Sequence, residues 1–321
     1  MFRRLALVAA LAVVAVGCQQ ESPAGSPLDA FWSAAAQTDD QRSEVLGRTR
    51  ALDSCALLPR AKLAELGSVI RVGTKDLNRC EAQLDVESHT KGKRVSWGVD
   101  APLKEAPYES LAPGKGTVER IGAATVALLS DQEMDPSAAA VRDVQRTCSA
   151  QVRFPAGAGV TLAVDTPAGT EPCAFAKSVA QVIVGEWNRE PRQGDSEDTV
   201  TTALTGADPC AVLPRLGPAA RATGRELARC AVTLRDQEIT LEYEYSGAEY
   251  MQSGLLAFTV GARPVYAVEA NGYTFLDAAV GTGFEPAAES ASGPLLPVIH
   301  VAGADRAALE EVMRQALSLF P

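Results

Sequence analysis

The sequence predicts an α+β fold of two tandem related domains, each a mainly antiparallel sheet packed by an N-terminal and a C-terminal helix. The first observation is an eight-residue motif that occurs twice, at 53–60 (DSCALLPR) and at 208–215 (DPCAVLPR), with six identical positions. The second is that another cysteine follows each copy, Cys80 and Cys230, and begins a strand-like run. Such identity across 155 residues indicates an internal duplication.

The first domain is expected over 52–188. Asp53 is placed to cap a short helix that ends near Gly67. Pro172 begins a longer helix with an apolar stripe along one face. Between the helices, alternation of apolar and polar residues predicts five strands, at 80–86, 94–100, 125–129, 149–154 and 160–165. Helices at both ends of a run of antiparallel strands are typical of an α+β layer architecture.

The second domain, 208–321, repeats this order of elements. We expect a helix at 210–222, strands that include 230–234, 239–245 and 296–301, and a final helix at 305–319. The second domain has no counterpart of Cys148 and Cys173, and Phe275 is expected at the place of Cys148. Residues 189–207 carry proline, glycine and an acidic run without apolar periodicity, so they are expected to form a solvated linker.

The N-terminus has the pattern of an export signal. Arg3 and Arg4 precede an apolar run, 5–17, that ends at Cys18 and is shorter than the roughly 20 residues of a membrane-spanning helix. The tetrapeptide Ala-Val-Gly-Cys at 15–18 resembles the lipobox of bacterial lipoproteins. We therefore expect a signal peptide at 1–17, lipid on Cys18, a tether and leader at 18–51, and attachment to the outer face of the cell membrane. Cleavage by the ordinary signal peptidase, giving a secreted protein, is the alternative.

The cysteine count agrees with export. The chain has seven cysteines, and setting Cys18 aside for lipid leaves an even number, as expected in an oxidising compartment. The repeat gives the two domains equivalent cysteines, which selects one framework among the possible pairings. The predicted disulfides are Cys55–Cys80, Cys148–Cys173 and Cys210–Cys230.

The start motif resembles a known family. Asp-Pro-Cys-Ala-x-Leu at 208–213, with a lipobox at the N-terminus and a second cysteine heading a strand, is similar to a family of actinobacterial lipoproteins of unknown function. The first copy departs from the motif at Ser54, where the family has proline. The resemblance implies an exported, disulfide-bonded α+β domain, and it supplies no catalytic residues.

Several classes of function are disfavoured by composition. A formal net charge of −10 without a basic run does not suit nucleic-acid binding, which needs clustered lysine and arginine. The two histidines, His89 and His300, lie 211 residues apart, and no zinc-binding or dinucleotide-binding motif occurs. His89 is expected in a turn and His300 in the core. We expect no catalytic site, no cofactor and no metal.

The tyrosines give the one indication of a partner surface. Five of the six lie within 243–273. Tyr243 and Tyr245 fall on the apolar phase of a strand, whereas Tyr250 follows Gly247 and is expected at the surface, where tyrosine suits protein interfaces. The predicted function is a non-catalytic binding module for an envelope protein or lipid. The alternatives are an envelope hydrolase, which would need a pocket that gathers carboxylates, and a structural, antigen-like surface protein without a specific ligand.

Overall fold

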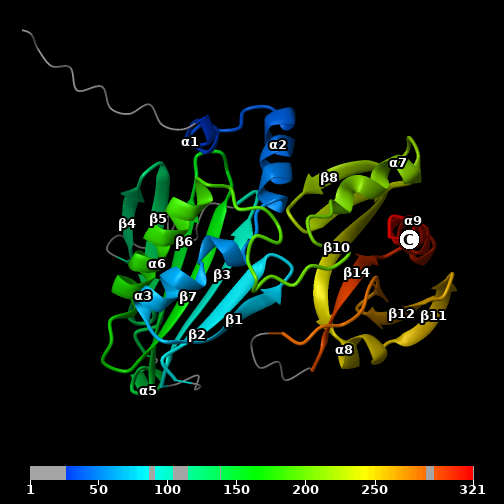
Figure 1. The fold of residues 1–321 in the computed structure, drawn as a ribbon. Coiled ribbons are helices and arrows are strands. Elements are labelled where there is room, and N and C mark those ends of the chain that lie inside the picture. The colour runs from blue at the N-terminus through cyan, green and yellow to red at the C-terminus, as the bar shows by residue number, and fades with distance from the viewer. Residues whose placement is uncertain (1–26, 87–90, 104–114, 138, 287–292, 321) are drawn as a thin grey trace, which may run out of the picture.

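The computed structural model describes residues 27–86, 91–103, 115–137, 139–286 and 293–320. The predicted signal peptide, Cys18 and His89 lie outside these residues. The chain forms two seven-stranded sheets with a few helices, and every strand pair is antiparallel (Figure 1). This confirms the α+β fold of two similar domains. Among the described residues, no helix is both long enough and apolar enough to span a membrane.

The first sheet has the strand order β1-β2-β3-β7-β6-β5-β4. Its strands are β1 Val69–Asp76, β2 Arg79–Leu84, β3 Lys93–Asp100, β4 Thr117–Ile121, β5 Ala124–Ser130, β6 Gln145–Arg153 and β7 Gly159–Pro167. Five strands were expected. The two additional ones, β1 and β4, are the edges of the sheet, where strands are exposed on more than one side and the alternation of apolar residues is weak.

The second sheet has the same topology, with the order β11-β12-β13-β14-β10-β9-β8. Its strands are β8 Arg221–Arg225, β9 Arg229–Leu234, β10 Gln237–Gly247, β11 Leu255–Val260, β12 Arg263–Ala270, β13 Tyr273–Ala279 and β14 Leu295–Gly303. The register is also shared, because Cys80 pairs with Trp97 in the first sheet and Cys230 with Leu241 in the second. The similarity of the two domains therefore extends over the strand order and register of both sheets.

Helices cover one face of each sheet. They are α1 Pro27–Trp32, α2 Asp39–Arg50, α3 Arg60–Leu66, α4 Asp131–Met134, α5 Ala139–Arg142, α6 Pro172–Trp187, α7 Leu213–Leu216, α8 Ala248–Gln252 and α9 Arg306–Leu317, with 3₁₀ turns η1 Cys55–Leu57 and η3 Pro209–Val212. The apolar stripe of α6 packs on the first sheet and that of α9 on the second (Figure 1). Each domain thus has its own buried core.

The two copies of the start motif form a 3₁₀ turn rather than a continuous helix. In the first copy, Pro59 ends the turn and α3 begins after it. In the second, α7 ends at Gly217, whose φ of 82° lies in the left-handed region, and the chain then enters β8. The helix expected at 210–222 is therefore wrong, because the chain turns at this glycine and continues as a strand.

The leader before the first domain is ordered and packed. Trp32 at the end of α1 is fully buried between Phe154 and Trp187 in the first core. The indole nitrogen of Trp32 donates to Glu190 at 2.8 Å. At the end of α2, Arg50 donates to the Leu227 carbonyl of the second domain at 2.9 Å. The leader therefore contacts both domains, and Figure 1 shows α2 standing between them.

The linker is folded onto the first domain, and the expectation of solvated chain is wrong. The fully buried carboxylate of Asp53 accepts hydrogen bonds from the backbone N–H groups of Gly194 and Ser196, both at 3.0 Å. It also accepts a hydrogen bond from the Thr199 hydroxyl. Asp198, within the acidic run, accepts hydrogen bonds from Arg60 of α3. These contacts fix 194–199 on the first domain, while the Glu197 side chain in the same run stays 80% exposed.

The cysteines are joined as the repeat predicts: Cys55–Cys80, Cys148–Cys173 and Cys210–Cys230, with Cα–Cα distances of 5.3, 5.1 and 5.3 Å. The register corrects one detail. Cys148 pairs with Val164, whose equivalent Gly303 pairs with Thr274, so Thr274 and not Phe275 takes the place of Cys148. Disulfides are typical of chains that fold in an oxidising compartment outside the cytoplasm.

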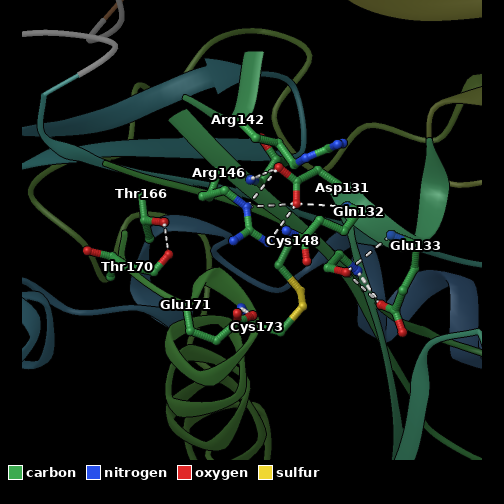
Figure 2. A network of polar contacts seen from close by, with 12 residues as sticks. Asp131, Gln132, Glu133, Arg142, Arg146, Cys148, Thr166, Thr170, Glu171 and Cys173 are labelled. Atoms are coloured by element: carbon green, nitrogen blue, oxygen red, sulfur yellow. Dashed lines mark hydrogen bonds and ion pairs between the residues drawn. A yellow bond between two sulfur atoms is a disulfide. The ribbon is translucent and has the colours of Figure 1, made fainter. Parts of the chain in front are cut away.

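A polar network surrounds the Cys148–Cys173 bridge (Figure 2). Arg146 donates hydrogen bonds to both carboxylate oxygens of Asp131, at 3.0 to 3.1 Å. Burial alone would raise the pKa of Asp131, but the hydrogen bonds from Arg146 and from backbone N–H groups outweigh it and the pKa is lowered. This network fixes the end of β5 against β6.

The lowered pKa of Asp131 gives a prediction for acid. A carboxylate of this kind stabilises the fold above its ordinary pKa of about 3.9, and the contribution is lost as the pH falls through the lower folded value. Asp131→Asn should therefore cost about 1–3 kcal/mol at neutral pH, and its difference from the unmodified protein should shrink below pH ~4. Urea unfolding across pH measures this. Asp39→Asn, at a carboxylate that is 95% exposed, is the control that should show no such difference.

The four edge strands of the two sheets differ in whether they carry charged residues, which discourage pairing with another chain. Three edge strands, β1, β4 and β8, contain charged residues. The fourth, β11, has the sequence LLAFTV and contains none. Its Leu255 and Leu256 are 81% and 63% exposed. This edge is therefore the most apolar of the four.

Candidate functional site

A groove of about 720 Å³ lies between the leader helix and the second domain. One wall is α2, where Ser43 and Leu46 line it, and the opposite wall is the edge strand β8 around Gly224. The floor comes from the first domain, at Pro102 and at the turn around Ala156. Most of the lining side chains are small or apolar, although Asp39, Arg42 and Arg225 also line the groove, and the volume lies within the range of small-molecule sites.

A second hollow of about 420 Å³ adjoins the groove, and both are lined by Ala101 and Pro102. It lies between the domains and has a different chemistry. Its charged lining comes from both sheets and their turns: Asp76, Arg79, Asp100, Glu226, Arg229, Glu242 and Glu244. With five carboxylates and two guanidinium groups, this cavity is acidic. The groove, lined mostly by small and apolar residues, therefore adjoins a cavity lined by many charged residues.

Tyr243 lines the acidic cavity and carries a hydroxyl without a partner. The residue is 1% exposed, and among the described residues nothing accepts from or donates to its oxygen. Burial raises the pKa of Tyr243, so the hydroxyl keeps its proton. A buried hydroxyl without a hydrogen bond is costly. Tyr243 alternates along β10 with Glu242 and Glu244 and packs in the core beneath α9, where its ring contacts Phe320, so its side chain points away from these two cavity carboxylates.

Carboxylates at the cavity have raised pKa values. Burial raises the pKa of Asp100, although Arg79 and the Thr161 hydroxyl, which donates to it at 3.1 Å, act in the opposite direction. Burial also raises the pKa of Glu244. Perturbed carboxylates in a cleft are typical of functional sites.

A third arrangement lies beside the cavity, on the face of the second sheet that α9 does not cover. Glu244, Asp277 and His300 place one potential metal-ligating atom each within 4.8 Å of one another. His300 Nδ1 lies 2.7 Å from Asp277 Oδ1. Burial alone would lower the pKa of His300, but this hydrogen bond outweighs it and the pKa is raised. His300 is therefore not in the apolar core where the sequence had suggested it.

The residues singled out in the sequence have separate locations. Tyr243 and Tyr245 are buried, as expected from their phase in the strand. Tyr250 lies in α8, is 63% exposed and lines neither hollow. Cys18 is outside the described residues, so the lipid anchor remains a prediction. The three disulfides support the sheets and lie outside both large hollows.

Sequence reasoning missed the groove and the group of Glu244, Asp277 and His300. A partial signal was present, because Glu244 lies on the polar phase of an alternating strand. No spacing in the sequence relates it to the other two residues, since only the order β10-β14-β13 makes their strands neighbours.

Comparisons with known proteins do not add a function. No protein-family model matches the chain, and no curated protein is significantly similar to it. The candidate site therefore depends on geometry alone.

Proposed function

We propose that the protein is a non-catalytic binding module of the cell envelope, and that it binds an amphipathic molecule between its two domains. The observation that carries the proposal is the pair of adjoining hollows, one apolar and one acidic, that share Ala101 and Pro102. The apolar part of the ligand would occupy the groove under α2. Its polar part would occupy the cavity, where carboxylates accept hydrogen bonds from hydroxyl groups.

The five carboxylates that line the cavity support a ligand with hydroxyl groups, which can donate hydrogen bonds to them. The acidic lining disfavours an anionic head group, because like charges repel strongly in a partly dehydrated site. A sugar-bearing lipid, neutral and rich in hydroxyl groups, fits both compartments. The export signal and the resemblance to envelope lipoproteins are consistent with a ligand of this class.

Binding of a fluorescently labelled glycolipid, measured by anisotropy, tests the proposal. Ser43 and Glu44 are adjacent exposed residues of α2, but only Ser43 lines the groove. Ser43→Trp should fill the groove and weaken binding at least about tenfold, which corresponds to about 1.4 kcal/mol. Glu44→Trp should leave it unchanged. Absence of saturable binding to the unmodified protein, or equal effects of the two tryptophans, would contradict the proposal.

A second pair of variants tests the polar compartment. Glu242→Gln removes the charge of a carboxylate that lines the cavity, so glycolipid binding should weaken. Tyr245→Phe removes a hydroxyl that is 3.0 Å from the Thr202 hydroxyl and does not line the cavity. It should lower stability and leave binding unchanged. Labelled palmitate, which has an anionic head group, should bind more weakly than the glycolipid.

The acidic cavity also favours a second candidate, the envelope hydrolase. Five carboxylates meet there, and a carboxyl group such as Asp100, with its raised pKa, is suited to proton donation. The same binding experiment separates the two functions. Release of a free sugar from the glycolipid during incubation would favour the hydrolase, whereas intact glycolipid recovered from the complex supports the binding module.

A further inference from the structure

We infer that Glu244, Asp277 and His300 form a binding site for a divalent transition-metal cation, with Zn²⁺ as its representative. The three residues lie on β10, β13 and β14, which are neighbouring strands of the second sheet. Glu244 also lines the acidic cavity, but the inference does not depend on the proposed ligand, because it can be tested with the metal alone.

The register of the three strands brings these side chains together. His300 on the middle strand pairs directly with Asp277. On its other side His300 pairs with Glu242, and Glu244 lies two residues further along the same strand, on the same face. Side chains at such direct and diagonal positions are within reach of one another. The potential ligand atoms accordingly lie within 4.8 Å of one another, so small side-chain rotations would bring them to the spacing that a single cation with bonds of about 2.0–2.2 Å requires.

Negatively charged side chains outnumber positively charged ones around Glu244. Asp277 is 5% exposed. Glu244 is partly buried, and its side-chain carboxylate has no hydrogen bond or ion pair with any residue that the structure describes. The charges that act on Glu244 include the further carboxylates of Glu242 and Asp76, and His300 is the one cationic group among them. Negative charge that is partly removed from water is costly unless a cation compensates it. A bound divalent cation would provide this compensation.

The donor set indicates which kind of cation fits. One imidazole nitrogen with two carboxylate oxygens is a ligand set typical of Zn²⁺ and neighbouring transition metals, whereas Ca²⁺ and Mg²⁺ take oxygen ligands. Three protein ligands leave a coordination position for water or a ligand. Phe275 stacks against the His300 ring with centroids 5.8 Å apart, which restricts the ring's orientation. All three ligands are on strands, which hold side chains more rigidly than loops do.

The first domain provides an internal comparison. The shared register makes Asp100, Gln151 and Thr161 the equivalents of Glu244, Asp277 and His300. There the Thr161 hydroxyl donates to Asp100, so the carboxylate already has a partner. In the second domain, where the Glu244 carboxylate has no hydrogen-bond partner among the described residues, the two other positions carry an imidazole and a second carboxylate. The two copies thus differ at the three positions that a cation would need.

Isothermal titration with ZnCl₂ tests the inference on the full chain without an affinity tag. Cys18→Ser is included in every sample, because its thiol would bind zinc independently. One Zn²⁺ per chain is expected, and Glu244→Gln and His300→Asn should each weaken binding at least about tenfold. Glu238→Gln is the matched control: it removes the same charge from the same phase of β10, away from the site, and should leave binding unchanged.

A spectroscopic readout covers the case in which His300→Asn does not fold. The chain has two histidines, so the imidazole region of its NMR spectrum contains two ring systems. Zn²⁺ should shift the His300 ring signals in the unmodified protein and much less in Glu244→Gln. The inference would be overturned by the absence of stoichiometric binding, by unchanged affinity in both ligand variants, or by a shift confined to His89.

Discussion

Replacement of Asp53 by alanine is expected to destabilise the protein by about 3–5 kcal/mol, because several buried hydrogen-bond donors would each lose their acceptor. The carboxylate is fully buried and accepts five hydrogen bonds. Two come from the turn η1, at Cys55 and Ala56, and three come from the linker, at 194–199. Alanine would leave all these donors without an acceptor and would release the linker from the first domain. Urea unfolding measures the loss.

The duplication supplies a matched control in Asp208. It caps η3 in the second domain as Asp53 caps η1 in the first, with a hydrogen bond from Cys210 N–H at 2.9 Å. Its side chain is 39% exposed and no linker contacts it in this way, although it pairs with Arg50 at 3.0 Å. Asp208→Ala should therefore cost about 1–2 kcal/mol. Equal losses for the two alanine variants would show that the linker contacts do not stabilise the first domain.

Reduction of the disulfides is expected to destabilise the first domain more than the second. The bridges close loops with sequence separations of 25, 25 and 20 residues. The chain-entropy account assigns about 3 kcal/mol to each loop of this size. The first domain loses two such contributions and the second domain loses one, so the first domain should open at a lower concentration of denaturant.

Hydrogen exchange under reducing conditions locates the effect. Amides of β6 and β7 should exchange faster than those of β13 and β14, their equivalents in the second sheet. In a variant with Cys148→Ala and Cys173→Ala, reduction should affect the two sheets about equally, because one bridge then remains in each domain. Earlier opening of the second sheet in the unmodified protein would contradict the prediction.

The sequence was most informative where one face of a strand or helix is buried. Alternation identified β3 and β10, since their apolar residues face the cores beneath α6 and α9. It missed the edge strands β1 and β4, whose side chains are partly exposed on both faces. The predicted helix at 210–222 was wrong, because local helix propensity does not show that the chain turns at Gly217 and continues as β8.

The candidate sites were less predictable, because each depends on contacts between distant segments. Asp53 was expected to cap a helix through Leu66, but it accepts hydrogen bonds from the turn η1, and its burial results from the linker more than 140 residues later. Tyr243 was identified correctly as a buried strand residue, while the lack of a hydrogen-bond partner for its hydroxyl is evident only from the packed core of the second domain. The group of Glu244, Asp277 and His300 required the strand order, which local patterns do not contain.

The uncharged edge strand β11 has a consequence for the behaviour of the protein in concentrated solution. Edge strands expose backbone N–H and C=O groups that can pair with another chain, and charged side chains on an edge discourage such pairing. β11 has no such charge, and Leu255 and Leu256 on it are largely exposed. Aggregation through intermolecular strand pairing would therefore begin at this edge, and the net charge of −10 is the main opposing force, which salt would screen.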